Sequence, residues 1–495
     1  RCALNLQLEP SFRPTIAPYN FISFPRPTFH VQHLHAGEWN YVVWEIANYP
    51  RDKITGFVLS QELFGHAPGT EGIVTYDIDH IELQRVEADK FEGWQPAAGR
   101  LAFNHVGYRP ENTKIALGST VTADLFQVLE AATGEPVLTK GVEHVTNELG
   151  HFQMLNFSDL RTPGTYVLRA GDHVGRSFRI DDNVWRGTVE KALNFYYCER
   201  CNYDVPGLHA ECHKDLKGTH DGVTKVVNGG WHDAADFSQG CHQTGLSIYA
   251  MLTWIRQLEA RDEDPELRDR FIEEALWGLD WFLKSRFGDG YRIAFQVARI
   301  YTDNEIGTLD DIVHPAENIP WLNLLGSAVE AYAYETLKSH APETAERCLE
   351  AAVEDWQAGR AGVEAASFDQ DYLTASWSVL ASLHLYRILG EQRYLERATE
   401  DGRFLLACQQ RAFPDDIPLT GFYYSDATHN TIVQHNHLGF EESPLLALQA
   451  LCTALPDHKD WIAWYGAIVL HSTYYQERGA AYTSPYRMLI NALYR

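Results

Sequence analysis

The sequence predicts a multidomain chain in which two consecutive β-sandwiches are followed by an all-α domain. Apolar and polar residues alternate in short stretches, separated by Pro and Gly, over residues 1–96 and again over residues 97–181. From residue 184 to residue 495 the apolar residues instead recur with the 3.6-residue period of an α-helix. A chain of 495 residues, 45% of them hydrophobic, is long enough to give each domain its own core.

The two β domains are expected to differ in type. The first is expected to be a jelly-roll-like sandwich, with strands at Tyr41–Ile46, Gly56–Leu59 and Ile78–Leu83. The second opens with Leu101–Tyr108 and has a late strand at Gly164–Arg169. Its short length and dense turn signals suit an immunoglobulin-like sandwich.

The helical domain carries clear start signals. Asp264 is followed by Pro265, which is the pattern of an N-cap residue with proline at the first helical position. Ser443–Pro444 and Ser484–Pro485 repeat this pattern. Besides the helix that begins at Pro265, helices are expected at 186–198, 243–258, 320–338, 343–357, 371–389, 391–409, 444–454, 458–476 and 485–494.

The charge balance and the cysteines limit the partners of the protein. The 41 Lys and Arg residues against 67 Asp and Glu residues give a formal net charge of −26, which repels polyanions, so neither nucleic acid nor an anionic membrane is expected as a partner. No apolar run reaches the roughly 18 residues that span a bilayer. Four of the eight cysteines cluster with histidines between residues 198 and 241, which favours metal binding over a disulfide scaffold. Localisation stays open between the cytoplasm, the periplasm and secretion, although thiol-bound zinc and the lack of disulfide spacing favour the cytoplasm slightly. The oligomeric state leaves no readable mark in the sequence.

One short segment combines several residues that chemistry could use. The pair Gly229–Gly230 lets the backbone approach a ligand closely, and Trp231 offers a flat face on which a sugar ring could stack. Asp233 and Asp236 are three residues apart, so in a helical or turn-like segment they point the same way and can hold one water between them. The alternative is a helix start at which the dipole favours acidic residues and one Asp acts as the cap.

The segment Gly229–Asp236 resembles the G-G-W-x-D-A-G-D signature of glycoside hydrolase family 9, with Ala235 in place of the usual Gly. Leu101–Pro110 is similar to the opening strand of the immunoglobulin-like module that precedes many of these catalytic domains. Phe368–Leu373 and Leu385–Gly390 are similar to a helix in the middle of the family's barrel. The resemblance implies an (α/α)6 barrel of six inner and six outer helices that cleaves β-linked sugars, mostly β-1,4-glucans, with inversion.

The resemblance also assigns catalytic roles. Asp236 matches the general base that draws a proton from the attacking water, and Asp233 matches the residue that helps to hold this water. Inversion further needs a general acid about 6.5–9.5 Å from the base, which the family supplies near the end of its catalytic domain. Only about ten helices are expected here where the family has twelve, and no C-cap ends the helical pattern at Arg495. We therefore expect the barrel to be incomplete at its C-terminus and the true acid to lie beyond Arg495.

Within the chain, Glu441 is the candidate acid. Glu441 and Glu442 are the most site-like acidic residues late in the sequence, but Pro444 does not fit the acid motif of the family. Two dipole-favoured acids before a helix start would explain the same residues. If the acid lies elsewhere, His437 and Glu441 are expected to line substrate subsites.

A second group of residues suggests zinc. Structural zinc takes four N and S ligands in a tetrahedron, and Cys201, Cys212, His213 and His232 would supply them. Some members of the family resemble this, with a Cys2His2 zinc beside the signature. Cys198 is a competing ligand that helix 186–198 could instead bury as a small apolar residue, and unligated thiols with surface histidines remain the alternative to any metal.

The remaining candidates are less specific. The acidic segments 303–305 and 310–311 could bind calcium through carboxylates and carbonyls, although a solvated acidic loop is the favoured interpretation. Trp321 and Trp377 lie at helical positions and are expected in the core rather than at a sugar site. The first domain looks like a carbohydrate-binding module, although such sandwiches serve equally often as scaffolding.

Together these patterns predict a cellulase-like glycosidase acting on β-linked, chiefly β-1,4-linked, gluco-oligosaccharides or polysaccharides. One alternative is an exo-acting β-glucosaminidase of the same family, because the acidic surface suits a neutral or cationic sugar. The other is a catalytically incomplete fragment that binds sugar without turnover.

Overall fold

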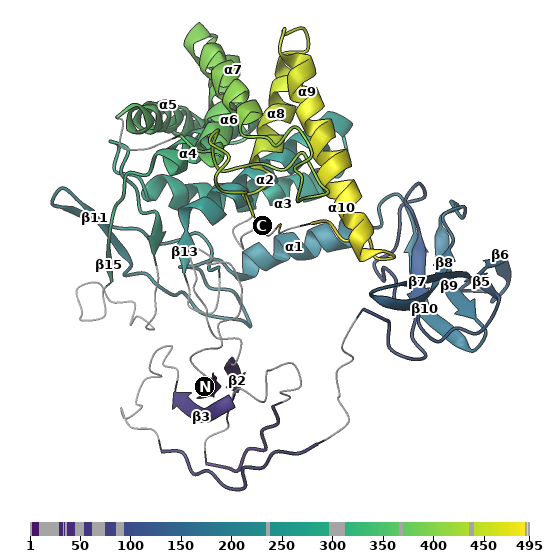
Figure 1. Ribbon diagram of the computed structural model, residues 1–495. Helices are drawn as coiled ribbons and strands as arrows, with labels where there is room; N and C mark the ends of the chain where they lie inside the picture. Colours follow the sequence, from purple (N-terminus) through teal and green to yellow (C-terminus); the bar gives the residue numbers. More distant parts are fainter. Residues whose placement is uncertain are drawn as a thin grey trace. The chain divides into compact units, whose positions relative to one another are not determined.

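The computed structural model describes residues 2–8, 29–32, 34, 37–44, 54–61, 75–85, 94–233, 238–296, 312–365, 370–434, 440–490 and 493. The chain divides into two compact units, of which the first contains the chain up to Glu92 and the second begins at Gly93 (Figure 1). The second unit holds both a β-sandwich and the helices. No helix in these described ranges is long and apolar enough to cross a bilayer.

The first unit contains a three-stranded antiparallel sheet in the order β2-β1-β3. Its strands are β1 (Cys2–Leu8), β2 (Phe29–Gln32) and β3 (Ile54–Gln61). The expected strand at Gly56–Leu59 lies inside β3. This single sheet is what the described residues show of the expected jelly-roll-like sandwich.

Two other strand predictions in this unit were wrong. Residues 41–44 and 75–85 carry no strand, and Ile78, Ile81 and Leu83 are more than half exposed to solvent. Alternation of apolar and polar residues favours an extended backbone, but a strand also needs a partner whose N–H and C=O groups complete the ladder. In the described residues of these two segments the alternation is present, but no strand ladder forms.

The second unit begins with a sandwich of two antiparallel sheets, in the orders β10-β9-β5-β6 and β4-β8-β7. The buried side of each sheet supplies an aromatic core, in which Phe178 contacts Tyr108 and Phe157 at ring-centroid distances of 5.8 and 5.3 Å. The late strand predicted at Gly164–Arg169 is β9. The seven strands are β4 (Ile115–Gly118), β5 (Leu125–Glu130), β6 (Pro136–Gly141), β7 (Glu143–Asn147), β8 (Gly150–Asn156), β9 (Gly164–Ala170) and β10 (His173–Ile180).

The helices form antiparallel hairpins, α2 with α3, α4 with α5, α6 with α7 and α8 with α9 (Figure 1). The inner helices α4 and α6 are buried on nearly every side, whereas the outer helices α5 and α7 bury one face. The bounds are α1 (Arg186–Cys198), α2 (Cys241–Arg261), α3 (Pro265–Lys284), α4 (Pro320–Leu337), α5 (Pro342–Glu364), α6 (Tyr372–Leu389), α7 (Gln392–Ala407), α8 (Ser443–Ala454), α9 (Trp461–Leu470) and α10 (Arg478–Ala480). Short strands between them are β11 (Lys217–His220), β12 (Val223–Val226), β13 (Gln239–Gly240), β14 (Phe295–Gln296) and β15 (Val313–Pro315).

The predicted start signal is confirmed at α3. The Asp264 side chain accepts a hydrogen bond from the backbone N–H of Leu267 at 3.2 Å, so it caps α3 as expected. Helix α8 also begins at the predicted place, with Pro444 in its first turn, but Glu442 rather than Ser443 is its N-cap residue and no side chain caps it. The pattern failed at Ser484–Pro485, where residues 484–490 form no helix. There the side chain of Thr483 accepts from the Met488 N–H, and Gln476 bonds both backbone groups of Ile490, so side chains satisfy the backbone in place of helical bonds.

The connections place the long loops together. The two helices of each hairpin are joined by a short turn, so the N-termini of α2, α4, α6 and α8 lie at the same end as the C-termini of α3, α5 and α7. The long segments 285–319 and 408–442 leave from that end, as does the segment that leads into α2. Binding groups on such a scaffold concentrate where the long loops gather.

Candidate active site and metal centre

Asp233 lies in the loop that leads into α2, and two side chains hold its carboxylate. Ser238 donates its hydroxyl to Oδ1, and Gln243, in the first turn of α2, donates its amide N–H to Oδ2 at 2.8 Å. The Asp233 N–H also bonds the Ser238 carbonyl at 3.0 Å, which closes the loop at its base. Asp233 itself is exposed, so the carboxylate is fixed in orientation and still open to a ligand. Asp236 lies outside the described residues.

The loop that carries Glu441 reaches the same helix end. The preceding residue, Phe440, is buried between His242 in the first turn of α2 and Trp321 at the start of α4, with ring centroids 5.7 and 5.3 Å away. Burial, together with the nearby charge of Glu441, raises the pKa of Tyr475 to about 12. The structure thus brings the loops of Asp233 and Glu441 onto the first turn of α2, whereas His437 lies outside the described residues.

Trp231 does not offer the expected stacking face. It is 5% exposed and packs in the core against Tyr196, with ring centroids 5.1 Å apart. Its indole N–H donates to Glu274 at 2.7 Å, and a Cβ on Gly278 would lie only 2.2 Å from the indole ring. The glycine of α3 therefore makes room for this ring, which anchors the loop rather than contacting substrate.

Glu274 links this anchor to a buried arginine. Arg200 is 3% exposed and donates to the two Glu274 oxygens at 3.1 and 2.8 Å. Its guanidinium lies about 5 Å from the rings of Tyr197, Tyr203 and Trp277. A buried carboxylate is stable only when its oxygens are paired, and here these contacts support the segment that leads to His232, where Arg200 and Trp231 also form a β-bridge.

The four predicted metal ligands converge beside this loop. One ligand atom from each of Cys201, Cys212, His213 and His232 lies within 4.8 Å of the others, and three of the four side chains are buried. The Cys201 Sγ is 3.5 Å from His213 Nδ1, the Cys212 Sγ is 3.3 Å from His232 Nε2, and the two histidine nitrogens are 3.2 Å apart. Four convergent N and S atoms are a ligand set that zinc prefers.

The electrostatics of the two thiols differ. The Cys212 pKa is lowered to about 2, first by the hydrogen bond from Cys201 and then by the two histidines, in spite of burial. The Cys201 pKa is raised by that same hydrogen bond and by burial. Cys198 stays outside the group, because its Sγ instead accepts from Asn194 at 3.4 Å. The seven cysteines whose side chains the structure describes, from Cys198 to Cys452, form no disulfides.

Sequence reasoning missed several polar residues around these sites. Ser238 and Gln243 had no signal of their own, because their role depends on where Asp233 lies in space. A second group of metal-type side chains, His220, Asp221 and Asp289, lies together near the β11–β12 turn and is largely exposed. The acidic segments considered for calcium, 303–305 and 310–311, lie outside the described residues.

Two family models match the chain. The model described as glycosyl hydrolase family 9 matches residues 185–486, and the model described as the cellulase N-terminal Ig-like domain matches residues 97–174. The chain belongs to glycosyl hydrolase family 9. The expected family and the expected immunoglobulin-like module are thereby confirmed.

The relatives of this family 9 chain are endoglucanases. Endoglucanase C of Cellulomonas fimi is 26% identical over 398 residues, which cover 67% of this chain and 35% of that protein. Endoglucanase D of Acetivibrio thermocellus is 25% identical over 60% of this chain and 52% of its own length. Among solved structures, a zinc-binding triple mutant of the family 9 endoglucanase J30 superposes with a TM-score of 0.56 and 19% identity over 75% of this chain and 72% of that one. The chain thus spans about a third to a half of the curated relatives it matches.

Proposed function

We propose that this protein hydrolyses β-1,4-linked gluco-oligosaccharides or polysaccharides with inversion at the anomeric carbon. The observation that carries the proposal is the family 9 match over residues 185–486, which includes the signature segment and its Asp233. The relatives named as endoglucanases support a glucan as the substrate class. We further infer that the inner and outer helices belong to an (α/α)6 barrel.

In this proposal Asp236 is the general base and Asp233 holds the attacking water beside it. The hydrogen bonds from Ser238 and Gln243 occupy one position on each Asp233 oxygen. Each carboxylate oxygen can accept more than one hydrogen bond, so positions remain for a water. A water held in a fixed orientation lowers the entropic cost of attack.

Glu441 is the candidate acid inside the chain. Its turn precedes α8, and Phe440 packs against the same first turn of α2 that holds Asp233. An inverting enzyme needs its two carboxyl groups about 6.5–9.5 Å apart with water and substrate between them, and two loops flanking one helix end can provide such a gap. If Glu441→Gln keeps full activity, Glu441 is a subsite residue and another carboxyl group is the acid.

We also propose that Cys201, Cys212, His213 and His232 hold a structural zinc. With Zn–S of about 2.3 Å and Zn–N of about 2.0 Å, a tetrahedron separates S from N by roughly 3.5 Å and N from N by roughly 3.3 Å. The separations of 3.5, 3.3 and 3.2 Å between these ligand atoms agree with that geometry. Zinc would crosslink the chain at residues 201, 212–213 and 232, and because His232 precedes Asp233 it would steady the loop of the acids.

A second candidate is an exo-acting β-glucosaminidase. The net charge of −26 favours this alternative, since it would attract a cationic glucosamine oligomer. The two activities separate cleanly when cellohexaose and the β-1,4-linked glucosamine hexamer are supplied to the same preparation. Mixed shorter products from cellohexaose support the proposal. Release of single sugars only from the glucosamine hexamer supports the alternative. If neither substrate gives a product, the protein binds sugar without hydrolysing it.

A further inference from the structure

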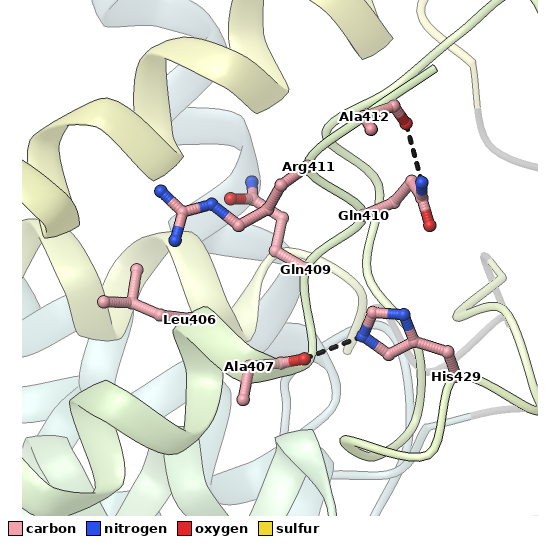
Figure 2. A pocket seen from close by; sticks show the side chains of 7 residues that line it. All are labelled: Leu406, Ala407, Gln409, Gln410, Arg411, Ala412 and His429. Atoms are coloured by element: carbon pink, nitrogen blue, oxygen red, sulfur yellow. Dashed lines mark hydrogen bonds between the residues drawn. The ribbon is translucent and has the colours of Figure 1, made fainter. Parts of the chain in front are cut away.

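A pocket of about 550 Å³ opens where α7 ends and the long segment 408–442 begins. Figure 2 shows side chains from the end of α7, from the chain that follows it and from His429 around this space. It lies at the same end of the helical hairpins as the Asp233 loop. The lining residues are Leu406, Ala407, Gln409, Gln410, Arg411, Ala412 and His429.

The walls of the pocket are fixed by internal hydrogen bonds. Gln409 is 1% exposed, and its amide nitrogen donates to the carbonyls of Gly421 and Ala467 at 3.1 and 2.8 Å. A nitrogen of the His429 ring bonds the Ala407 carbonyl at 2.7 Å (Figure 2). A binding site held this way loses little entropy when a ligand enters.

The lining offers both donors and acceptors to a ligand. The Arg411 side chain is exposed, and no described residue pairs with its guanidinium, so all of its N–H groups are available. Because Nε2 of His429 donates to a carbonyl, its Nδ1 carries a lone pair that can accept a hydroxyl. His429 also stacks on Tyr424 with ring centroids 4.3 Å apart, which holds the imidazole plane. Donors and acceptors in one pocket match a ligand rich in hydroxyl groups.

Two exposed aromatic rings, Phe413 and Tyr474, extend this lining. Phe413, the residue after Ala412, is 49% exposed, and Tyr474 is 42% exposed, with their ring centroids 6.1 Å apart. The Arg478 guanidinium lies 5.0 Å from the centre of the Phe413 ring. Exposed aromatic faces next to hydroxyl-binding groups suit the apolar faces of pyranose rings.

We propose that this pocket and the adjacent rings, whose residues include neither Asp233 nor Glu441, bind a neutral β-linked oligosaccharide. No carboxylate occurs among the described lining residues and Arg411 is the one full charge among them, so a cationic glucosamine chain is disfavoured here although the whole protein is acidic. The choice of a gluco-oligosaccharide rests on the proposed function, whereas the existence of the site rests on the geometry alone.

The test measures binding without turnover. Isothermal titration of the full chain with a thio-linked cellohexaose, which is not hydrolysed, is carried out on the native protein, on Arg411→Ala and on Arg403→Ala. Arg403 lies on α7, pairs with Asp460 at 2.8 Å, and neither residue lines the pocket, so Arg403→Ala controls for the loss of one positive charge. Hydrogen bonds from a charged group predict at least tenfold weaker binding for Arg411→Ala and no change for Arg403→Ala.

Hydrogen exchange of the native protein locates the ligand independently of any variant. The hexaose is expected to protect backbone amides of residues 408–413, and Arg411→Met serves in place of the alanine variant if the latter fails to fold. Equal affinity of Arg411→Ala, tighter Arg411-dependent binding of the glucosamine hexamer, or Arg411-dependent binding of inorganic phosphate alone would each overturn the proposal. Hydrolysis of ordinary cellohexaose is assayed separately. Absence of turnover would refute the proposed function, whereas the proposal of this binding site would still stand or fall by the binding data.

Discussion

Replacing Cys201 by serine should remove bound zinc from the protein. Cys201 is fully buried, and its Sγ is one of the two sulfur atoms of the ligand group. Cys198, three residues earlier in the chain, provides a matched control, because its Sγ bonds Asn194 and lies outside the group of metal ligands. Only Cys201→Ser should therefore lose the metal, whereas Cys198→Ser should keep it.

The expected loss of stability follows from mass action. A ligand that binds only the folded state at 1,000 times its dissociation constant stabilises it by about 4 kcal/mol. For a domain of about 300 residues that corresponds to a fall in unfolding temperature of roughly 6 °C when zinc is removed. Chelation of zinc from the native protein should lower the unfolding temperature by the same amount as Cys201→Ser, because the loss of one metal ion is the main change in both cases.

Elemental analysis by mass spectrometry and scanning calorimetry measure both quantities on the same samples. The native protein and Cys198→Ser should contain about one zinc per chain, and Cys201→Ser close to none. Cobalt substitution adds a check, since tetrahedral thiolate ligation gives strong visible absorption that Cys201→Ser should lack. Zinc retained by Cys201→Ser, or lost equally from Cys198→Ser, would refute the assignment of the ligands.

Two further predictions concern buried charges. Glu274→Gln should lower the free energy of unfolding by roughly 3–5 kcal/mol, because it leaves the buried Arg200 without its charged partner. Glu273→Gln is the control: its side chain is 67% exposed, so the same denaturation assay should show a loss of about 1 kcal/mol or less. Glu335 is partly buried, which raises its pKa, but hydrogen bonds led by that from His384 outweigh burial and set the pKa at about 2. Its charge therefore stabilises the fold above the ordinary pKa of 4.5, so Glu335→Gln should cost on the order of 3 kcal/mol at pH 7 and progressively less as the pH falls from 4.5 towards 2. Glu391→Gln, at an exposed ion pair, should cost about 1 kcal/mol or less at pH 7. A cost for Glu335→Gln that is the same at pH 7 and pH 3 would contradict this reasoning.

Much of the helical domain could be predicted because its signals are local. Helix α1 has the predicted bounds, and the Asp264 cap and the proline start of α8 identified two helix starts from two residues each. The same pattern at Ser484–Pro485 failed because the following residues find side-chain partners for their backbone groups. A local pattern predicts which secondary structure a segment can form. Contacts with residues outside the segment, such as Gln476, determine whether that structure forms.

The site was only partly predictable for the same reason. The Cys and His ligands share a chemical type, so their clustering in sequence was a usable signal for the metal group. Trp231 was misjudged, since the same ring suits a sugar and a core, and only the space left by Gly278 on another helix decides between them. Ser238 and Gln243 are ordinary polar residues whose hydrogen bonds to Asp233 depend on the folded path of the chain.

The measurement that tests the account most directly is the anomeric form of the first product. Proton nuclear magnetic resonance follows fresh cellohexaose with the native protein and with Asp236→Asn, before the products mutarotate. The account predicts that the α-anomer appears first and that Asp236→Asn lowers the rate by several orders of magnitude while the fold is kept. Initial formation of the β-anomer, or undiminished turnover by Asp236→Asn, would contradict it.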